Sequence, residues 1–191
     1  MTMNLKKKLW NARRKAAKMI APGTLQLGGY IDATLIRAKD GKVIDLGRHN
    51  AIVNEGKNYI LDTMFNTGTQ IVDANWYISL VDASGWTSWA VTNTIASKTW
   101  SEFTTYTPST RPVWTAGAAA TQQITNGTPV TFTMTGGGTV KGVFIIGGSD
   151  PDADTIGDVV QGTLWANAPF SGGDVPVSTS DQLKVTYTVT T

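Results

Sequence analysis

The sequence predicts a mainly β domain, an antiparallel β-sandwich or barrel-like fold with one short helix and an N-terminal basic arm. Charged residues make up only 16% of the 191 residues, below the roughly 25% that is usual in soluble domains. The chain contains 20 glycines, and its apolar residues fall mostly in short segments between turn residues, as in proteins built from many short strands. Hydrophobic residues make up 41%, which is enough for a core. We therefore expect an arm in residues 1–23 and one sandwich-like domain in residues 24–191.

The arm combines a helical pattern with a strong positive charge. Its apolar residues recur at steps of three and four, as on one face of a helix: Leu5, Leu9, Ala12, Ala16 and Met19. Pro22 and Gly23 end this pattern. Residues 1–31 contain seven basic residues and no acidic one, whereas residues 66–191 contain four basic and nine acidic residues. The excess of positive charge therefore belongs to the arm and not to the body of the protein.

Three kinds of partner fit such an arm. Its cations could bind the phosphates of a nucleic acid, or the arm could lie on an anionic membrane surface with its apolar side chains inserted. It could also clamp an acidic protein surface, and its composition resembles that of an organellar targeting peptide. We favour the protein clamp over nucleic acid or membrane, because the arm precedes a β body that has the features of an assembly module. The expected contact residues are Lys6, Lys7, Lys8, Trp10, Arg13, Arg14, Lys15 and Lys18.

The first part of the domain predicts a β-hairpin. Residues 25–38 are rich in strand-forming side chains, and residues 43–53 have the same character. Asp40 and Gly41 stand between them as a strong signal for a tight turn. We expect the two segments to pair with each other.

The pattern after the hairpin changes to that of a helix over residues 55–66. Asn54 is a residue type that can cap a helix, and Gly68 can close it. The apolar residues of this segment lie on one face of a helix: Ile60, Leu61, Met64 and Phe65. We expect this to be the one helix of the body.

The pattern after residue 70 is one of strands and turns. The candidate strands are Trp76–Val81, Thr99–Tyr106, Val130–Thr135, Val140–Ile146, Gly162–Ala166 and Leu183–Val189. The last of these alternates regularly between apolar and polar side chains, as a strand with one buried face does. Glycines 136–138 form a tight link between two of the strands. This spacing favours an antiparallel sandwich or a barrel-like domain over a repeat architecture.

Catalytic chemistry has almost no support in the sequence. His49 is the only histidine, and it lies in a strand-like segment without a nucleophile motif nearby, so we interpret it as structural or as a surface residue. The chain contains no G-x-S-x-G, no P-loop and no H-E-x-x-H motif. We therefore expect neither an enzyme nor a bound cofactor.

An acidic loop is the one candidate for a metal site. Four carboxylates lie at alternating or nearby positions, as in the first part of a calcium-binding loop: Asp150, Asp152, Asp154 and Asp158. Thr155 occupies the place of the glycine that the sharp turn of such a loop requires, and Gln161 occupies the place of the bidentate glutamate. We therefore favour a solvated acidic loop and expect no tight calcium binding.

Seven tryptophans raise the alternative of a sugar-binding surface. Four of them fall in or beside candidate strands, where burial in the core or in a subunit contact is the better interpretation: Trp76, Trp100, Trp114 and Trp165. Trp86 and Trp89 flank a loop rich in Gly and Ser and are the better candidates for exposed aromatic contacts.

The remaining features limit the setting of the protein. There is no cysteine, which excludes disulfides and thiolate metal sites. No run of about 18 apolar residues is present, so we expect no membrane-spanning helix. The N-terminus lacks the apolar segment of a secretory signal, which favours synthesis and folding in a cytoplasm.

Several segments, taken in order, resemble a family of small virion structural proteins of tailed bacteriophages. The segments are residues 52–65 (IVNEGKNYILDTMF), 75–81 (NWYISLV), 101–106 (SEFTTY), 110–117 (TRPVWTAG), 142–146 (GVFII), 162–165 (GTLW) and 181–189 (DQLKVTYTV). The resemblance covers roughly residues 30–190 and leaves the arm outside. It implies a structural protein of the virion, with head decoration (cement) proteins as the first comparison, and it carries over no catalytic residue.

The resulting expectation is a capsid decoration protein that is made in the host bacterial cytoplasm and resides in the virion. It would bind the outer capsid lattice and stabilise the head by protein–protein adhesion. Its partners would be the major capsid protein or other virion proteins, and a homo-oligomer, foremost a trimer, would add multivalency. The alternatives are a neck, collar, tail or baseplate component and a host glycan-binding module that uses Trp86 and Trp89.

Overall fold

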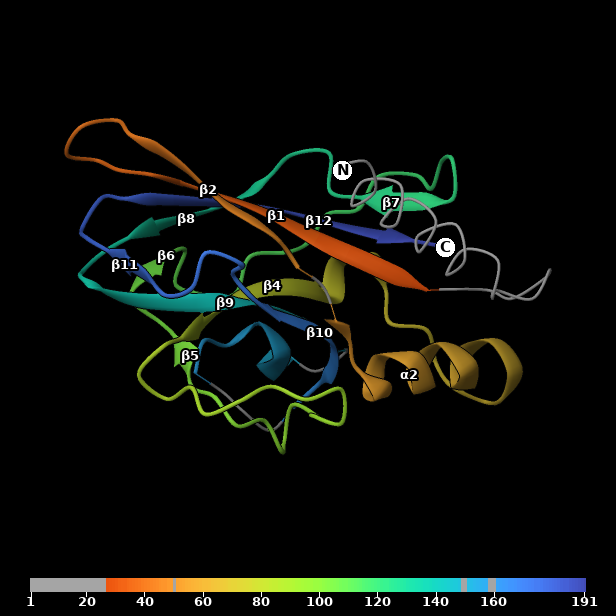
Figure 1. Ribbon diagram of the computed structural model, residues 1–191. Helices are drawn as coiled ribbons and strands as arrows, with labels where there is room; N and C mark the ends of the chain where they lie inside the picture. Colours follow the sequence, from red (N-terminus) through yellow and green to blue (C-terminus); the bar gives the residue numbers. More distant parts are fainter. Residues whose placement is uncertain (1–26, 50, 149–150, 158–160) are drawn as a thin grey trace, which may run out of the picture.

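The protein folds into two antiparallel β-sheets that pack face to face (Figure 1). The computed structural model describes residues 27–49, 51–148, 151–157 and 161–191. Strands account for 44% and helices for 11% of the structure. The mainly β, sandwich-like fold that the sequence predicts is therefore confirmed, with two separate six-stranded sheets.

The first sheet has the strand order β2-β1-β12-β8-β6, and β7 also pairs with β12. Its strands are β1 (Gly28–Ile36), β2 (Val43–His49), β6 (Tyr106–Thr107), β7 (Gln123–Thr125), β8 (Val130–Met134) and β12 (Gln182–Thr190). β1 and β12 pair along their full lengths, from Gly28 opposite Thr190 to Ile36 opposite Gln182. This pair forms the centre of the sheet and brings the last strand of the chain beside the first strand that the structure describes.

The second sheet has the strand order β3-β10-β9-β4-β5, and β11 also pairs with β9. Its strands are β3 (Ala51–Ile52), β4 (Trp76–Asp82), β5 (Glu102–Phe103), β9 (Gly138–Gly147), β10 (Thr163–Pro169) and β11 (Val175–Val177). The helical elements are α2 (Asn54–Phe65) and the short 3₁₀ helices η1 (Asp73–Asn75) and η2 (Pro151–Asp154). Within the described residues α2 is the single α-helix, and its bounds lie within one residue of the predicted range 55–66.

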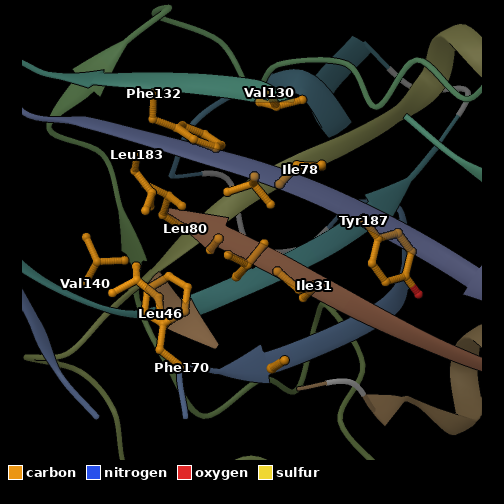
Figure 2. Close-up of a cluster of buried hydrophobic side chains, with 14 of the residues drawn as sticks. Ile31, Leu46, Ile78, Leu80, Val130, Phe132, Val140, Phe170, Leu183 and Tyr187 are labelled. Carbon is orange, nitrogen blue, oxygen red and sulfur yellow. The ribbon is translucent and has the colours of Figure 1, made fainter. Parts of the chain in front are cut away.

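The main core lies between the two sheets (Figure 2). On the side of the first sheet it contains Leu183, Val185 and Tyr187, which are fully buried. These are alternate residues of β12, as the apolar-polar alternation predicts. From the second sheet, Ile78 and Leu80 of β4 face them.

A second apolar cluster covers the outer face of the second sheet. Phe144 and Ile146 of β9 belong to this cluster, whereas Val143 and Ile145 belong to the main core. The cluster is completed by loop residues such as Trp100 and by Ala153 of η2. A strand segment that is buried on both faces needs an unbroken apolar run, and residues 143–146 of β9 (VFII) form such a run.

Two predicted strands are each divided between the sheets, which corrects the sequence interpretation. The returning segment 43–53 forms β2, which pairs with β1, and β3, which pairs with β10 in the other sheet. Residues 99–106 likewise give β5 in the second sheet and the start of β6 in the first. Periodicity reports the local conformation of a segment but not its pairing partner, so these crossings leave no local signal.

The helix α2 packs closely on β10, and its contact residue is a glycine. Gly56 is the buried residue of this helix. A Cβ atom at Gly56 would lie 2.6 Å from the carbonyl oxygen of Trp165 and 3.0 Å from its Cα. The expected cap at Asn54 is wrong, because Val53 is the N-cap residue and no side chain caps the helix. Close contact with the sheet therefore determines where the helix lies.

We predict that Gly56→Ala destabilises the fold. Alanine gains roughly 1 kcal/mol over glycine inside a helix, but overpacking against backbone atoms costs about 1–3 kcal/mol, and the carbonyl of Trp165 cannot rotate away. Urea unfolding should show a net loss of up to about 2 kcal/mol in the free energy of unfolding. Gly127→Ala is the matched control, because no atom lies within 4 Å of its Cβ position. Equal stability of the two variants would contradict this account of the helix contact.

Candidate functional site

An exposed apolar surface on α2 is the most prominent candidate for a docking site. Leu61, Met64 and Phe65 are 56%, 64% and 78% exposed. Ile60, from the same predicted apolar face, packs partly against the main core. Isolated apolar residues on a surface are normal, but a cluster on one helix marks an interaction site.

The packing of α2 explains why this face points to solvent. Gly56 and Tyr59 lie three residues apart and so share the side of the helix that faces the sheets. The Tyr59 ring packs edge-on against Trp76, with ring centres 5.6 Å apart, and its hydroxyl accepts a hydrogen bond from the Ile71 N–H at 2.6 Å. This side holds the helix on the body, and Leu61, Met64 and Phe65 are left exposed to solvent.

A groove extends the apolar surface toward the end of the first sheet. It has a volume of about 820 Å³ and is lined by Leu27, Gly28, Lys57, Ile60, Leu61, Met64, Thr190 and Thr191. Figure 1 shows α2 at the end of the sandwich where β1 begins and β12 ends. We call this groove, together with the exposed residues Leu61, Met64 and Phe65, the docking surface.

Glu55 holds the other side of α2. Its Oε2 accepts hydrogen bonds from the Leu164 N–H at 2.9 Å and from the Ile95 N–H at 3.2 Å. Burial raises the pKa of the Glu55 carboxyl above its ordinary value, and these two hydrogen bonds oppose that rise. The helix is therefore tied both to β10 and to the loop that contains Ile95.

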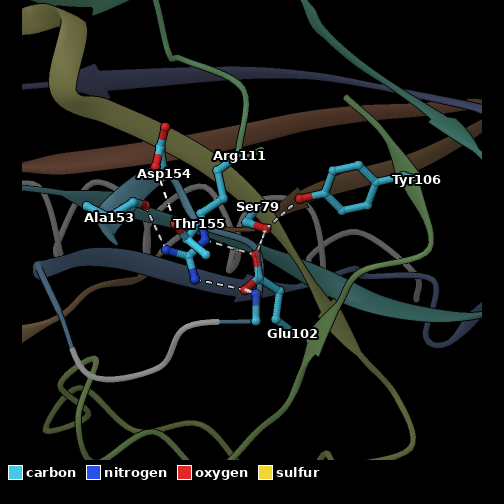
Figure 3. A network of polar contacts seen from close by, with 8 residues as sticks. Ser79, Glu102, Tyr106, Arg111, Ala153, Asp154 and Thr155 are labelled. Atoms are coloured by element: carbon cyan, nitrogen blue, oxygen red, sulfur yellow. Dashed lines mark hydrogen bonds and ion pairs between the residues drawn. The ribbon is translucent and has the colours of Figure 1, made fainter. Parts of the chain in front are cut away.

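A buried ion pair between Glu102 and Arg111 holds the loops on the outer face of the second sheet (Figure 3). Arg111 donates from Nε to Glu102 Oε1 at 2.9 Å and from Nη2 to Glu102 Oε2 at 2.8 Å. Glu102 Oε1 also accepts a hydrogen bond from the Ser79 hydroxyl, which lies 3.1 Å from the Tyr106 hydroxyl. Burial raises the pKa of Tyr106, so this phenol stays protonated. The two side chains of the ion pair are 0% and 1% exposed.

The same ion pair holds the segment that contains η2. Arg111 Nη1 donates to the carbonyl of Ala153 at 2.7 Å, and the Arg111 N–H donates to the carbonyl of Asp154 at 2.7 Å. Glu102 Oε2 accepts a hydrogen bond from the Gly157 N–H at 2.6 Å. These charged groups are buried and bonded to one another, so they join β5, the Arg111 segment and the η2 segment. The sequence analysis did not identify this pair. A signal for it was present, because Glu102 and Arg111 are charged residues among strand-forming residues in a chain that has few charged residues.

The residues of the predicted arm lie outside the part of the chain that the structure describes. They are Lys6, Lys7, Lys8, Trp10, Arg13, Arg14, Lys15 and Lys18. Asp150 and Asp158 of the acidic loop also lie outside it, as does the side chain of Asp152, while Asp154 is half-buried. Among the described residues, no group of three or more His, Cys, Asp or Glu side chains comes together to hold a metal ion. The backbone of His49 lies in β2, opposite Ile31.

The tryptophans of the loop before β5 differ in exposure. Trp89 is 37% exposed, whereas Trp86 is half-buried against Trp100, with ring centres 6.3 Å apart. The ammonium group of Lys141 lies 5.9 Å from the centre of the Trp86 ring. Trp100, Trp114 and Trp165 are buried, as the sequence predicts, and Trp76 is half-buried.

No protein-family model matches the sequence, and no curated protein is significantly similar to it. Within the described residues, no helix has the length and apolar character needed to cross a bilayer. The arguments about function therefore rest on the residues and on the geometry of these surfaces.

We predict that Arg111→Met and Glu102→Leu are each strongly destabilising. Removal of one partner leaves the other charge buried and unpaired, which costs about 3–5 kcal/mol. The double variant should lose less than the sum of the single losses, because it leaves no unpaired charge. Chemical denaturation of the four proteins in the double-mutant cycle measures this coupling.

The pair Lys141–Asp174 supplies the control for this cycle. The Asp174 side chain is 51% exposed, so Asp174→Ala should change the free energy of unfolding by less than about 1 kcal/mol. Strictly additive losses at Arg111 and Glu102 would show that the two side chains do not stabilise each other.

Proposed function

We propose that the protein is a structural component of a tailed-bacteriophage particle, a decoration protein that binds the outer face of the capsid lattice and stabilises the head by adhesion. The observation that carries this proposal is the docking surface on α2. It is considered together with the series of sequence segments that resembles phage virion proteins. The proposed mechanism is burial of apolar surface against a partner and involves no chemical reaction.

The docking surface is small, so we expect one contact to be weak and many copies on a lattice to bind tightly together. Full burial of a Leu, Met or Phe side chain contributes about 1.5–3 kcal/mol, and Leu61, Met64 and Phe65 are all more than half exposed. Part of this gain offsets the lost freedom of the two partners. Many identical weak contacts on a repeating lattice add up through multivalency, above all if the protein is itself an oligomer.

The low charge of the chain supports the same proposal. Charged residues are depleted at the cores of protein interfaces, and only 16% of this chain is charged. The basic residues of the arm would add a second contact, with an acidic surface of a neighbouring capsid protein. A basic segment of this length can contact a large area of its partner.

A neck, collar, tail or baseplate position is the alternative within the virion. Both positions require the same kind of surface, but they differ in copy number. We predict that quantitative mass spectrometry of purified virions finds this chain within a few-fold of the number of major capsid proteins. A far lower ratio would move the protein to the neck or tail, and absence from virions would overturn the structural role.

We also predict that the double variant Leu61→Ser/Phe65→Ser binds purified capsids at least about tenfold more weakly, because it removes more than 1.4 kcal/mol of apolar burial. Sedimentation of capsids with bound protein measures the affinity. The stability of the variant should change by no more than about 0.5 kcal/mol, because both side chains are exposed. Val43→Ser is the matched control, since Val43 is 64% exposed at the start of β2 and lies outside the docking surface. Unchanged capsid binding by the double variant would exclude the α2 face as the contact.

A further inference from the structure

A second groove, on the opposite flank of α2 from the docking surface, is lined mainly by polar side chains. Its volume is about 830 Å³. One wall is α2, and the other walls are the segment after the helix, the loop at residues 92–94 and the start of β10. Helical spacing places two sets of α2 side chains on opposite flanks. Glu55, Asn58 and Asp62 line this groove. Lys57, Leu61 and Met64 line the groove of the docking surface.

The described residues that line the groove offer many hydrogen-bonding groups and no positive charge. Asn58 and Asp62 project from the helix, and Thr92, Gln161 and Thr163 line the groove from the other walls. No lysine, arginine or histidine is among the described residues that line it. Phosphate, sulfate and carboxylate ligands are usually bound through charge-assisted bonds from cations, and the two carboxylates of the groove would repel them. This lining therefore favours a neutral ligand with many hydroxyl groups.

Two side chains in the groove each have an oxygen atom without a hydrogen-bond partner among the described residues. Glu55 is held through Oε2 by the N–H groups of Leu164 and Ile95, while its Oε1 receives no hydrogen bond from the described residues. The hydroxyl of Thr63 is buried and has no hydrogen-bond partner within the described part of the chain. Burying a polar group without a partner costs free energy, so a ligand hydroxyl that bonds to Thr63 would recover stability. The second oxygen of Glu55 is a further acceptor for such a ligand.

The groove also has an apolar wall. Tyr59 and Ile71 line it, and Tyr59 is held by its edge-on contact with Trp76 and by the hydrogen bond from Ile71 to its hydroxyl. A sugar ring presents hydroxyl groups at its rim and C–H groups on its faces, so it matches a site that combines polar groups with a fixed aromatic ring.

We propose that this groove binds a neutral saccharide. Its hydroxyl groups donate to the carboxylates of Glu55 and Asp62 and exchange hydrogen bonds with the amide of Asn58, and one ring face lies against Tyr59. The site is separate from the docking surface, so a protein bound to a virion through Leu61, Met64 and Phe65 keeps it available. The proposal goes beyond capsid adhesion and does not depend on it.

The test is a titration of the full chain with a panel of neutral sugars: glucose, galactose, mannose, rhamnose, N-acetylglucosamine and their oligomers. Saturation-transfer NMR detects binding and isothermal titration calorimetry measures it. We expect at least one sugar to bind with a dissociation constant of about 1 mM or tighter. Glucose 6-phosphate and sialic acid should bind more weakly than their neutral counterparts.

Two double variants locate the site. Asn58→Ala/Asp62→Ala should weaken binding at least about tenfold while the unfolding midpoint stays unchanged, because both side chains are exposed. Lys57→Ala/Met64→Ala, on the opposite flank, should leave the affinity unchanged. No binding by any neutral sugar, tighter binding of the anionic sugars, or equal affinity of the Asn58/Asp62 variant would each overturn the proposal. Loss of binding in Trp86→Ala alone would place the sugar on the tryptophan loop instead and would equally overturn it.

Discussion

The buried pair of Glu102 and Arg111 is the interaction on which the arrangement of the loops depends. Glu102 belongs to β5 in the second sheet, and four residues later Tyr106 begins β6 in the first sheet. The pair therefore lies where the chain crosses between the sheets, and it also binds the carbonyl groups of the η2 segment. A buried ion pair is costly to desolvate and is stable only when all of its groups are bonded. Here Ser79, Gly157 and Ala153 provide those bonds.

The close contact between α2 and β10 has the largest consequence for function. Since Gly56 allows the helix backbone to approach Trp165, only a narrow side of the helix is buried. One flank then exposes Leu61 and Met64, and the opposite flank exposes Asn58 and Asp62. A helix with a wider apolar contact would have buried one of these flanks. The same element therefore presents an apolar surface and a polar groove that can be occupied at the same time.

The two proposals assign different kinds of partner to these two surfaces. The apolar flank gains free energy by removing its area from water, with little directional preference, which suits contact with a repeated protein lattice. The polar flank has fixed acceptors and an aromatic wall, which suit a small neutral ligand. Charge is also unevenly distributed along the chain, with basic residues in the arm and an excess of acidic residues over residues 66–191.

The sequence by itself determined the elements whose pattern is local. The alternation in residues 183–189 predicted β12, and the change of period after residue 54 predicted α2 at nearly its observed bounds. Low charge and frequent glycine predicted the sandwich-like class. The short strands β7 and β11, with three residues each, are too brief for periodicity to indicate.

Only the tertiary structure decided which segments meet. The division of residues 43–53 and 99–106 between two sheets depends on partners far away in the chain. The pairing of Glu102 with Arg111 has no local pattern, because the chain between them crosses from one sheet to the other, and a separation of nine residues then sets no fixed distance between the two side chains. The exposure of the apolar α2 stripe depends on how closely Gly56 approaches β10. Periodicity shows that a face is apolar, but which face is buried depends on contacts that the chain makes only after folding.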